Sequence, residues 1–206
     1  MTIDANDAAN ISAAIQAGGN IWKSPLVDDF KQKAKTYYRD LLEEQCCYCR
    51  KNTLGEFKMV LDIEHILPKS KFPQYMFATF NLSISCKRCN MNIKKEDVSF
   101  VTDLTQIDTT PQQSGLYKIV HPNVDDYFEH ISYYTQTIDD KKIVKYRIIN
   151  ESSKGQFTYD YFKLNELEVD SINQAQGLQN DETVSDLIDP VIAKQIEDLL
   201  RASKKK

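Results

Sequence analysis

The sequence has 206 residues, of which 41% are hydrophobic and 27% are charged, and its formal net charge is −4. A chain of this length and composition is expected to bury a core and to form one globular domain, or one domain with extensions. The sequence contains no apolar run of about 18 residues and begins with no pattern of a secretory signal, which excludes a membrane-spanning helix and favours a cytoplasmic protein.

The first part of the chain is predicted to hold one helix. Residues 1–23 are rich in Ala, Asn and Gly, and we expect them to be weakly ordered. Residues 24–45 are predicted to form an amphipathic helix, because Ser24 suits an N-cap, Pro25 suits the first turn, and apolar residues then recur at three- and four-residue steps.

Residues 46–100 contain most of the motifs. Within them residues 59–63 alternate like a strand, residues 69–79 resemble a loop and residues 89–95 suit a short helix. The stretch 50–95 carries nine Lys or Arg against three acidic residues, so the remainder of the chain is acidic. Such a basic segment fits a surface that faces phosphates, although a solvated basic face explains the charge equally well.

Residues 101–206 are predicted to form an acidic extension of helices and a hairpin, suited to regulation or to docking on a partner. Strands at 130–138 and 143–149 flank a polar turn, and helical patterns follow at 164–178 and 189–200, before a frayed tail at 203–206. Five aromatic residues in this part favour core packing over stacking on nucleobases; they are Tyr133, Tyr134, Tyr159, Tyr161 and Phe162.

Four of the five cysteines form two C-x-x-C pairs, Cys46 with Cys49 and Cys86 with Cys89. Two such pairs complete the tetrahedral set of four thiolates that zinc prefers in structural sites, and they leave no position for a reacting water. Buried free thiols or a redox pair are the alternatives. Pairing Cys47 with Cys49 would leave only one residue between the two ligands, a poorer metal-binding turn, so we expect Cys47 to be a packed thiol.

Between the cysteine pairs lie residues that suit phosphodiester hydrolysis. The pKa of a free histidine lies near neutrality, so His65 suits a general base. Glu64 offers an anionic oxygen and Asn90 a neutral one, a set that suits Mg²⁺ or Mn²⁺. Three cationic side chains are placed to contact phosphates: Lys87, Arg88 and Lys94.

Each of these residues also has a plain structural explanation. Glu64 and His65 could be a satisfied hydrogen-bond pair, Asn90 could cap a helix, and Asn81 could be an ordinary turn residue. His121 and His130 lie outside the motif, and we expect both to be structural.

The arrangement resembles the HNH, or ββα-metal, nucleases. The string E-H-I-L-P-K-S at 64–70, followed by N-L-x-x-S-C-x-x-C-N at 81–90, is similar to the HNH proteins encoded with ATPases in Septu-type and retron-associated anti-phage systems. The resemblance covers residues 46–95, and more loosely 121–125 and 164–165. It implies an α+β fold with a ββα-metal core on a four-cysteine zinc knot, cleavage of nucleic acid (DNA foremost) by metal-site water, and a separate ATPase partner. It also implies that Asn81 ties down the loop that aims His65.

The sequence departs from the family pattern in three places. Glu64 stands where Asp is commoner, Asn90 stands where His is commoner, and Lys94 follows Asn90 by four residues rather than three. A non-catalytic zinc ribbon that binds nucleic acid or protein is therefore the alternative function. A third possibility is a nuclease that is silent until a partner ATPase licenses it. Nothing in the chain resembles a P-loop, so we expect any nucleotide sensing to come from another protein.

Overall fold

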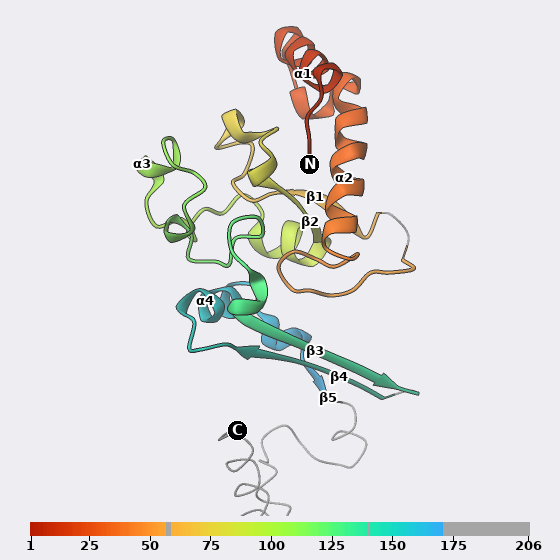
Figure 1. Ribbon diagram of the computed structural model, residues 1–206, viewed down its shortest axis with the longest axis vertical. Helices are drawn as coiled ribbons and strands as arrows, with labels where there is room; N and C mark the ends of the chain where they lie inside the picture. Colours follow the sequence, from red (N-terminus) through yellow and green to blue (C-terminus); the bar gives the residue numbers. More distant parts are fainter. Residues whose placement is uncertain (57–58, 140, 171–206) are drawn as a thin grey trace, which may run out of the picture. The chain divides into compact units, whose positions relative to one another are not determined.

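The computed structural model describes residues 1–56, 59–139 and 141–170, and these residues form a mixed α+β fold, as predicted (Figure 1). In chain order the helices and strands are α1 (Ala5–Ala17), α2 (Asp28–Leu41), β1 (Leu61–His65), β2 (Leu82–Cys86), a π-helix (Arg88–Lys94), α3 (Leu104–Ile107), β3 (Ile131–Ile138), β4 (Lys141–Ile148), α4 (Ser153–Tyr161) and β5 (Val169–Asp170). Single 3-10 turns lie at Ile21–Lys23, Pro25–Val27, Pro73–Tyr75, Thr79–Asn81, Ser114–Leu116, Tyr127–Glu129 and Leu164–Leu167.

The chain divides into two compact units. The first comprises Met1–Tyr133 and Tyr146–Leu167, and it holds every predicted site residue. The second, as far as the structure describes it, is the outer part of the β3–β4 hairpin with β5 paired antiparallel to β4, Val144 opposite Val169.

The core of the first unit is the antiparallel β1–β2 ribbon with α2 packed against it (Figure 1). Every residue of β2 is buried, and α2 buries Phe30, Ala34 and Tyr38, which recur at four-residue steps along one face. The register pairs Leu61 with Cys86 at one end of the ribbon and His65 with Leu82 at the other. These two ends lie about 13 Å apart, given a rise of about 3.4 Å per residue.

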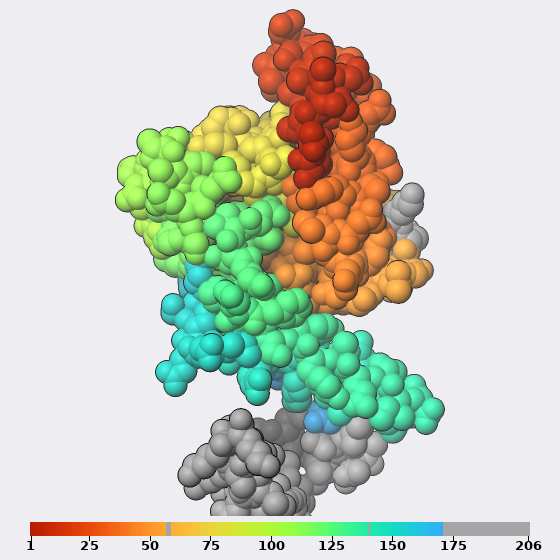
Figure 2. Space-filling view, viewed as in Figure 1, coloured from red at the N-terminus to blue at the C-terminus, as the bar shows by residue number. Residues whose placement is uncertain are grey.

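Residues 1–23 differ from the expectation of weak order. The Asp4 side chain accepts a hydrogen bond from the Asp7 N–H and the Asp7 side chain accepts one from the Asp4 N–H, a capping box that starts α1. Lys33 on α2 then binds the carboxylates of both residues at 2.7 Å. The N-terminal arm, defined as residues 1–23, lies on α2 as Figure 2 shows in red and orange. The capping box and the ion pair of Lys33 with the buried Asp7 stabilise α1, so the expectation of weak order, which rested on composition, was wrong.

The predicted helix at 24–45, the first strand, the short helix at 89–95 and the hairpin agree with the structure to within a few residues. Ser24 caps the 3-10 turn that leads into α2, the first strand begins and ends two residues later than predicted, and the hairpin is present. The helical pattern at 164–178 gives only a 3-10 turn and β5 in its described part; the predictions for 171–178, 189–200 and 203–206 lie outside the described residues. Among the residues described, none of the helices has the length and apolar character to cross a bilayer.

Candidate metal centre and active site

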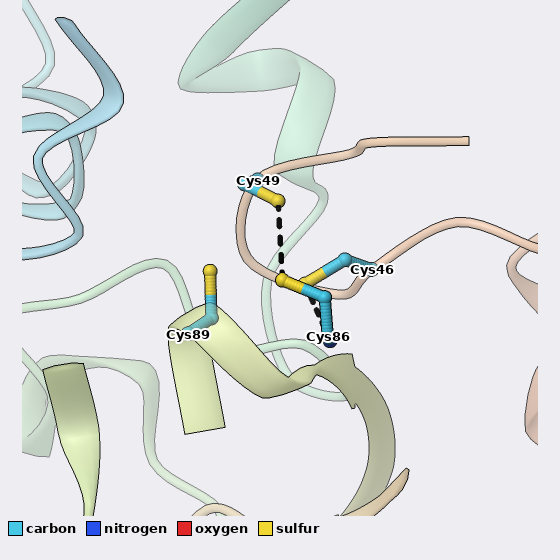
Figure 3. Close-up of side chains that lie close together, drawn as sticks. All are labelled: Cys46, Cys49, Cys86 and Cys89. Atoms are coloured by element: carbon cyan, nitrogen blue, oxygen red, sulfur yellow. Dashed lines mark hydrogen bonds between the residues drawn. The ribbon is translucent and has the colours of Figure 1, made fainter. Parts of the chain in front are cut away.

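Four cysteine side chains meet at the end of the ribbon, as the sequence predicted. Their sulfur atoms all lie within 4.8 Å of one another and all four residues are buried: Cys46, Cys49, Cys86 and Cys89 (Figure 3). The sulfurs of Cys49 and Cys86 are 3.9 Å apart. A zinc ion with Zn–S bonds of about 2.3 Å in a tetrahedron requires sulfurs about 3.8 Å apart, so the cluster fits a structural zinc ion.

Local backbone hydrogen bonds shape this cluster. The Arg50 N–H donates to the Cys46 carbonyl, which closes the turn that brings Cys46 and Cys49 together, and the Cys86 N–H donates to the Cys46 sulfur at 3.3 Å. Cys47 is equally buried but does not belong to the cluster. The described geometry therefore leaves Cys47 as a thiol packed beside the metal site.

His65 ends β1 at the opposite end of the ribbon. Its Nε2 atom lies 3.0 Å from the Met76 carbonyl oxygen, and because a carbonyl can only accept, Nε2 must carry the hydrogen. The lone pair of the neutral ring is then on Nδ1, which has no hydrogen-bond partner among the described residues. Burial, with the charge of Lys69 second, lowers the pKa of His65 to about 3, so the ring is neutral at physiological pH. Nδ1 is therefore free to accept a proton, while the burial that keeps the ring neutral also makes it a weaker base than a free histidine.

Asn81 clamps the loop that carries Met76. Its Oδ1 accepts from the Leu67 N–H at 2.6 Å, and its Nδ2 donates to the carbonyls of Leu67 and Tyr75, each at 3.0 Å. The Asn81 side chain is fully buried; its two bonds to Leu67 are buried and its bond to Tyr75 is part-buried. The clamp ends one residue before Met76, which makes Asn81 part of the support of the His65 ring.

Replacement of this clamp is expected to lower stability. Asn81→Ala removes three hydrogen bonds, two of them buried, each with a net contribution of about 1 kcal/mol, and leaves their backbone partners unsatisfied, so the free energy of unfolding should fall by about 3 kcal/mol. Asn81→Asp keeps the acceptor but loses both donors, and should be no more stable than Asn81→Ala. Chemical denaturation of the three proteins measures the effect, and a loss below about 1 kcal/mol would contradict it.

Glu64 lies on the opposite face of β1 from His65 and is paired within the protein. Its carboxylate forms an ion pair with Lys94 at 2.8 Å and accepts a hydrogen bond from the Tyr48 hydroxyl at 3.1 Å. Both Glu64 and Lys94 are only 1% exposed. Burial raises the pKa of the Glu64 carboxyl, and the Lys94 ammonium and Tyr48 hydroxyl oppose that rise. An ammonium group therefore stands where the sequence predicted a divalent cation, and the arrangement does not fit Mg²⁺ or Mn²⁺ at Glu64 unless Lys94 moves.

The unusual spacing of Lys94 has a structural explanation. Residues Arg88–Lys94 form a π-helix, in which the Lys95 N–H donates to the Asn90 carbonyl five residues earlier. A π-helix has more residues per turn than an α-helix and is often found at functional sites. The wider turn accommodates the additional residue after Asn90 and brings Lys94 to Glu64. Asn90 itself is half-buried, and its side chain has no hydrogen bond among the described residues.

The three cations predicted to contact phosphates have different surroundings. Lys94 is buried and paired, as described above. Arg88 donates to the Phe162 and Lys163 carbonyls at 2.8 Å and to the Glu166 carboxylate at 2.9 Å, so its guanidinium joins the π-helix to residues 162–166. Lys87 is exposed and, with Lys51, lines a cavity of about 350 Å³ beside the cysteines. Of the three, Lys87 is exposed, Arg88 is a quarter exposed and already paired within the protein, and Lys94 is buried.

Two further residues support the site, and sequence reasoning gave neither a role. Asn123 donates its Nδ2 to the Phe80 and Leu82 carbonyls at 2.8 and 2.7 Å, and so supports the turn that holds Asn81. Trp22 contacts the His65 ring. Asn123 belongs to the string H-P-N at 121–123, and Trp22 is the only tryptophan of the chain. No local pattern in the sequence connects either residue with His65.

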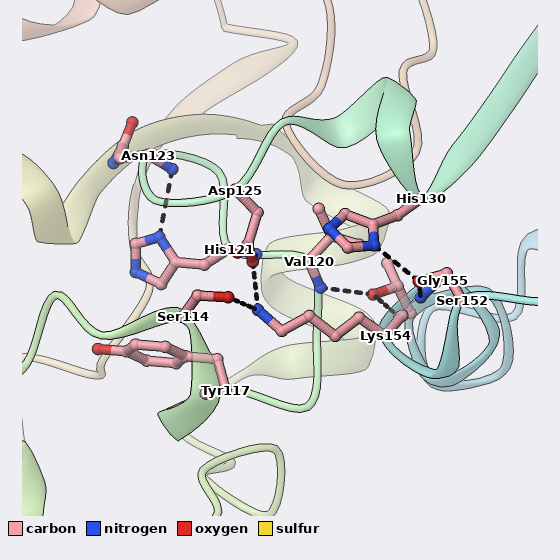
Figure 4. A network of polar contacts seen from close by, with 12 residues as sticks. Ser114, Tyr117, Val120, His121, Asn123, Asp125, His130, Ser152, Lys154 and Gly155 are labelled. Atoms are coloured by element: carbon pink, nitrogen blue, oxygen red, sulfur yellow. Dashed lines mark hydrogen bonds and ion pairs between the residues drawn. The ribbon is translucent and has the colours of Figure 1, made fainter. Parts of the chain in front are cut away.

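The other two histidines have structural surroundings, which agrees with the expectation. His121 is fully buried and its Nδ1 accepts from the Asn123 N–H at 3.2 Å, while His130 Nδ1 lies 2.6 Å from the Ser152 hydroxyl (Figure 4). Of the aromatic residues, Phe162 stacks on Tyr48 with ring centroids 4.1 Å apart, whereas Tyr134 is exposed. The packing expectation therefore holds for Phe162 and does not hold for Tyr134.

The chain is similar in sequence to two curated proteins, although no protein-family model matches it. It is 27% identical over 154 residues to the Septu protein PtuB of Bacillus thuringiensis, an alignment that covers 75% of this chain and 47% of that protein. It is 29% identical over 100 residues to protein ea31 of Escherichia phage lambda, covering 47% of this chain and 28% of that protein. The chain thus spans less than half the length of each of these relatives. The similarity to PtuB supports the Septu-type relationship that the motifs indicated.

Proposed function

We propose that this chain is an endonuclease of an anti-phage defence system and hydrolyses phosphodiester bonds, of DNA foremost, with His65 as the general base. The observation that carries the proposal is the His65 ring, which is neutral, held through Nε2 by Met76, and has its Nδ1 lone pair available. The order strand, strand, helix that includes His65 and the cluster of four cysteines at the other end of the ribbon add support, as does the similarity to the Septu protein PtuB.

The proposed chemistry uses His65 to activate water. Nδ1 takes a proton from a water molecule as its oxygen bonds to phosphorus, and the bond from phosphorus to the leaving oxygen breaks on the opposite side. The His65 ring is neutral before the reaction and can accept one proton during it, which suits this step. Lys69, whose charge lowers the pKa of His65, is the cation that we propose stabilises the negative charge developing on the phosphate.

The divalent cation stays a prediction. Glu64 and Asn90 remain the proposed ligands, but a cation at Glu64 must displace the Lys94 ammonium, which already neutralises that carboxylate. This same pairing favours the second candidate function, a zinc-ribbon module that binds nucleic acid without cutting it. A binding module can keep Glu64 as a structural ion pair, whereas a nuclease that uses Glu64 as a metal ligand must first break the pair with Lys94.

One experiment separates the two functions. Supercoiled plasmid is incubated with the chain, with and without Mg²⁺ or Mn²⁺, and with and without a candidate partner ATPase. We expect cleavage that requires the divalent ion and increases with the partner, since the acidic extension should oppose binding of DNA by the chain alone. Binding without cleavage under all these conditions would favour the binding module.

The salt dependence of binding tests which cations contact DNA. Affinity should fall with a slope of about −0.9 log units per phosphate contact, so Lys87→Ala should make the slope shallower by about 0.9 and weaken binding to all sequences alike. Arg88→Ala should change the slope less and stability more, because Arg88 binds two carbonyls and a carboxylate of the protein. Titrations at several salt concentrations measure both slopes; an equal change for the two variants would contradict this assignment.

A further inference from the structure

The His65 ring has a second contact besides Met76. The indole of Trp22 meets it edge to face, with ring centroids 4.4 Å apart and an interplanar angle of 76°. Trp22 also packs against Phe77, at a centroid distance of 5.7 Å, and Phe77 in turn packs edge to face against Phe30 of α2. The neighbour of the proposed base is thus part of a continuous aromatic group that reaches the helix core.

Trp22 is held in this place from α2. Lys31 donates to the Trp22 carbonyl at 3.2 Å, and Asn20 caps the 3-10 turn that carries Trp22 by accepting from the Lys23 N–H. Further along the N-terminal arm, Lys33 binds Asp7, which is 2% exposed. These contacts fix the backbone on both sides of Trp22, so the position of the indole against His65 is determined by the fold.

The contact with Trp22 adds a second restraint on the buried His65 ring. The one hydrogen bond, from Nε2 to Met76, fixes the position of that atom without by itself fixing the tilt of the ring. An aromatic neighbour at edge-to-face distance removes that freedom and contributes favourable packing at the same time. The direction of the Nδ1 lone pair decides how well the base meets an attacking water, because small misplacement of a reacting group lowers the rate steeply.

We propose that Trp22 is a positioning residue for the reaction: it holds the His65 ring so that Nδ1 faces the attacking water. The N-terminal arm is then part of the active site rather than an appendage of it. This inference rests on the proposed function, since it concerns the rate of the step that His65 performs.

Kinetics of three variants test the proposal. Trp22→Ala should lower kcat about 10-fold with KM changed less than about 2-fold, and Trp22→Phe, which keeps an aromatic ring, should recover most of the loss. Ile15→Ala, an exposed residue of the same arm, is the matched control and should retain full activity. A faster Trp22→Ala enzyme would overturn the proposal and identify Trp22 as a lid; an unchanged kcat, or equal losses in Trp22→Ala and Trp22→Phe, would also overturn it.

Fluorescence supplies a readout that is independent of cleavage. Because Trp22 is the only tryptophan, its emission reports this one environment. His65→Ala should shift the emission to longer wavelength as water reaches the indole, whereas His130→Ala should leave it unchanged. An unshifted emission in His65→Ala overturns the contact itself. If the wild type cleaves nothing while the His65→Ala shift is present, the contact is real but the proposed function fails, and the positioning role falls with it.

Discussion

Cys46→Ser and Cys89→Ser are expected to lose the bound zinc and to unfold the part of the chain around the β1–β2 ribbon. The four sulfurs lie within 4.8 Å of one another and each comes from a buried residue. Structural zinc contributes roughly 10 kcal/mol or more to folding, which is comparable to the whole stability of an ordinary domain. Elemental analysis should find about one zinc per wild-type chain and none in the variants, and circular dichroism should show the loss of structure.

Cys47→Ala is the matched control for this experiment. Cys47 is as buried as the four ligands and lies between two of them in sequence, but it does not belong to the cluster. It should therefore keep its zinc and lose only the stability that a small buried side chain provides, about 1 kcal/mol. Well-folded wild-type protein without zinc would contradict the assignment. Loss of zinc in Cys47→Ala with retention in Cys46→Ser would show that the wrong sulfur was chosen.

The features predicted well are those fixed by residues close in sequence. The spacing C-x-x-C is local, and so are the cap at Ser24 and the two strands β3 and β4. Helix α4 was not predicted, because Gly155 in its first turn weakens the helical pattern. In the structure a Cβ at this position would lie 2.5 Å from the His130 carbonyl oxygen, so the close approach of the two segments requires glycine.

The features missed depend on residues far apart in sequence. The surroundings of His65 come from Trp22 and Met76, and no periodicity or motif links residue 22 with residue 65. The pairing of Glu64 with Lys94 depends on a π-helix, which adds one residue to a turn and thereby changes which side chain faces the strand. The charge pattern predicted that Lys94 and Arg88 contact phosphates, because a pattern of charges does not show which residues are paired within the protein. In the structure Lys94 pairs with Glu64, and Arg88 binds residues 162–166.

His65→Ala is expected to lower the rate of phosphodiester cleavage about 10²- to 10⁴-fold, the usual cost of removing a general base. Binding of nucleic acid should change little, because the proposed phosphate contact at Lys87 lies toward the other end of the ribbon, about 13 Å away along the strand. Single-turnover cleavage of a labelled duplex measures the rate, and fluorescence anisotropy of the same duplex measures the affinity.

The fold must survive the substitution for this result to concern catalysis. His65→Ala removes the hydrogen bond to Met76 and the contact with Trp22, which together contribute about 2 kcal/mol, less than the stability of a typical domain. His130→Ala is the matched control, since it also removes a histidine with one hydrogen-bond partner, here Ser152, and should cleave at the wild-type rate. If folded His65→Ala cleaves undiminished, His65 is not the base. If both histidine variants lose activity in proportion to their lost stability, the effect is structural and the binding module becomes the better account of this chain.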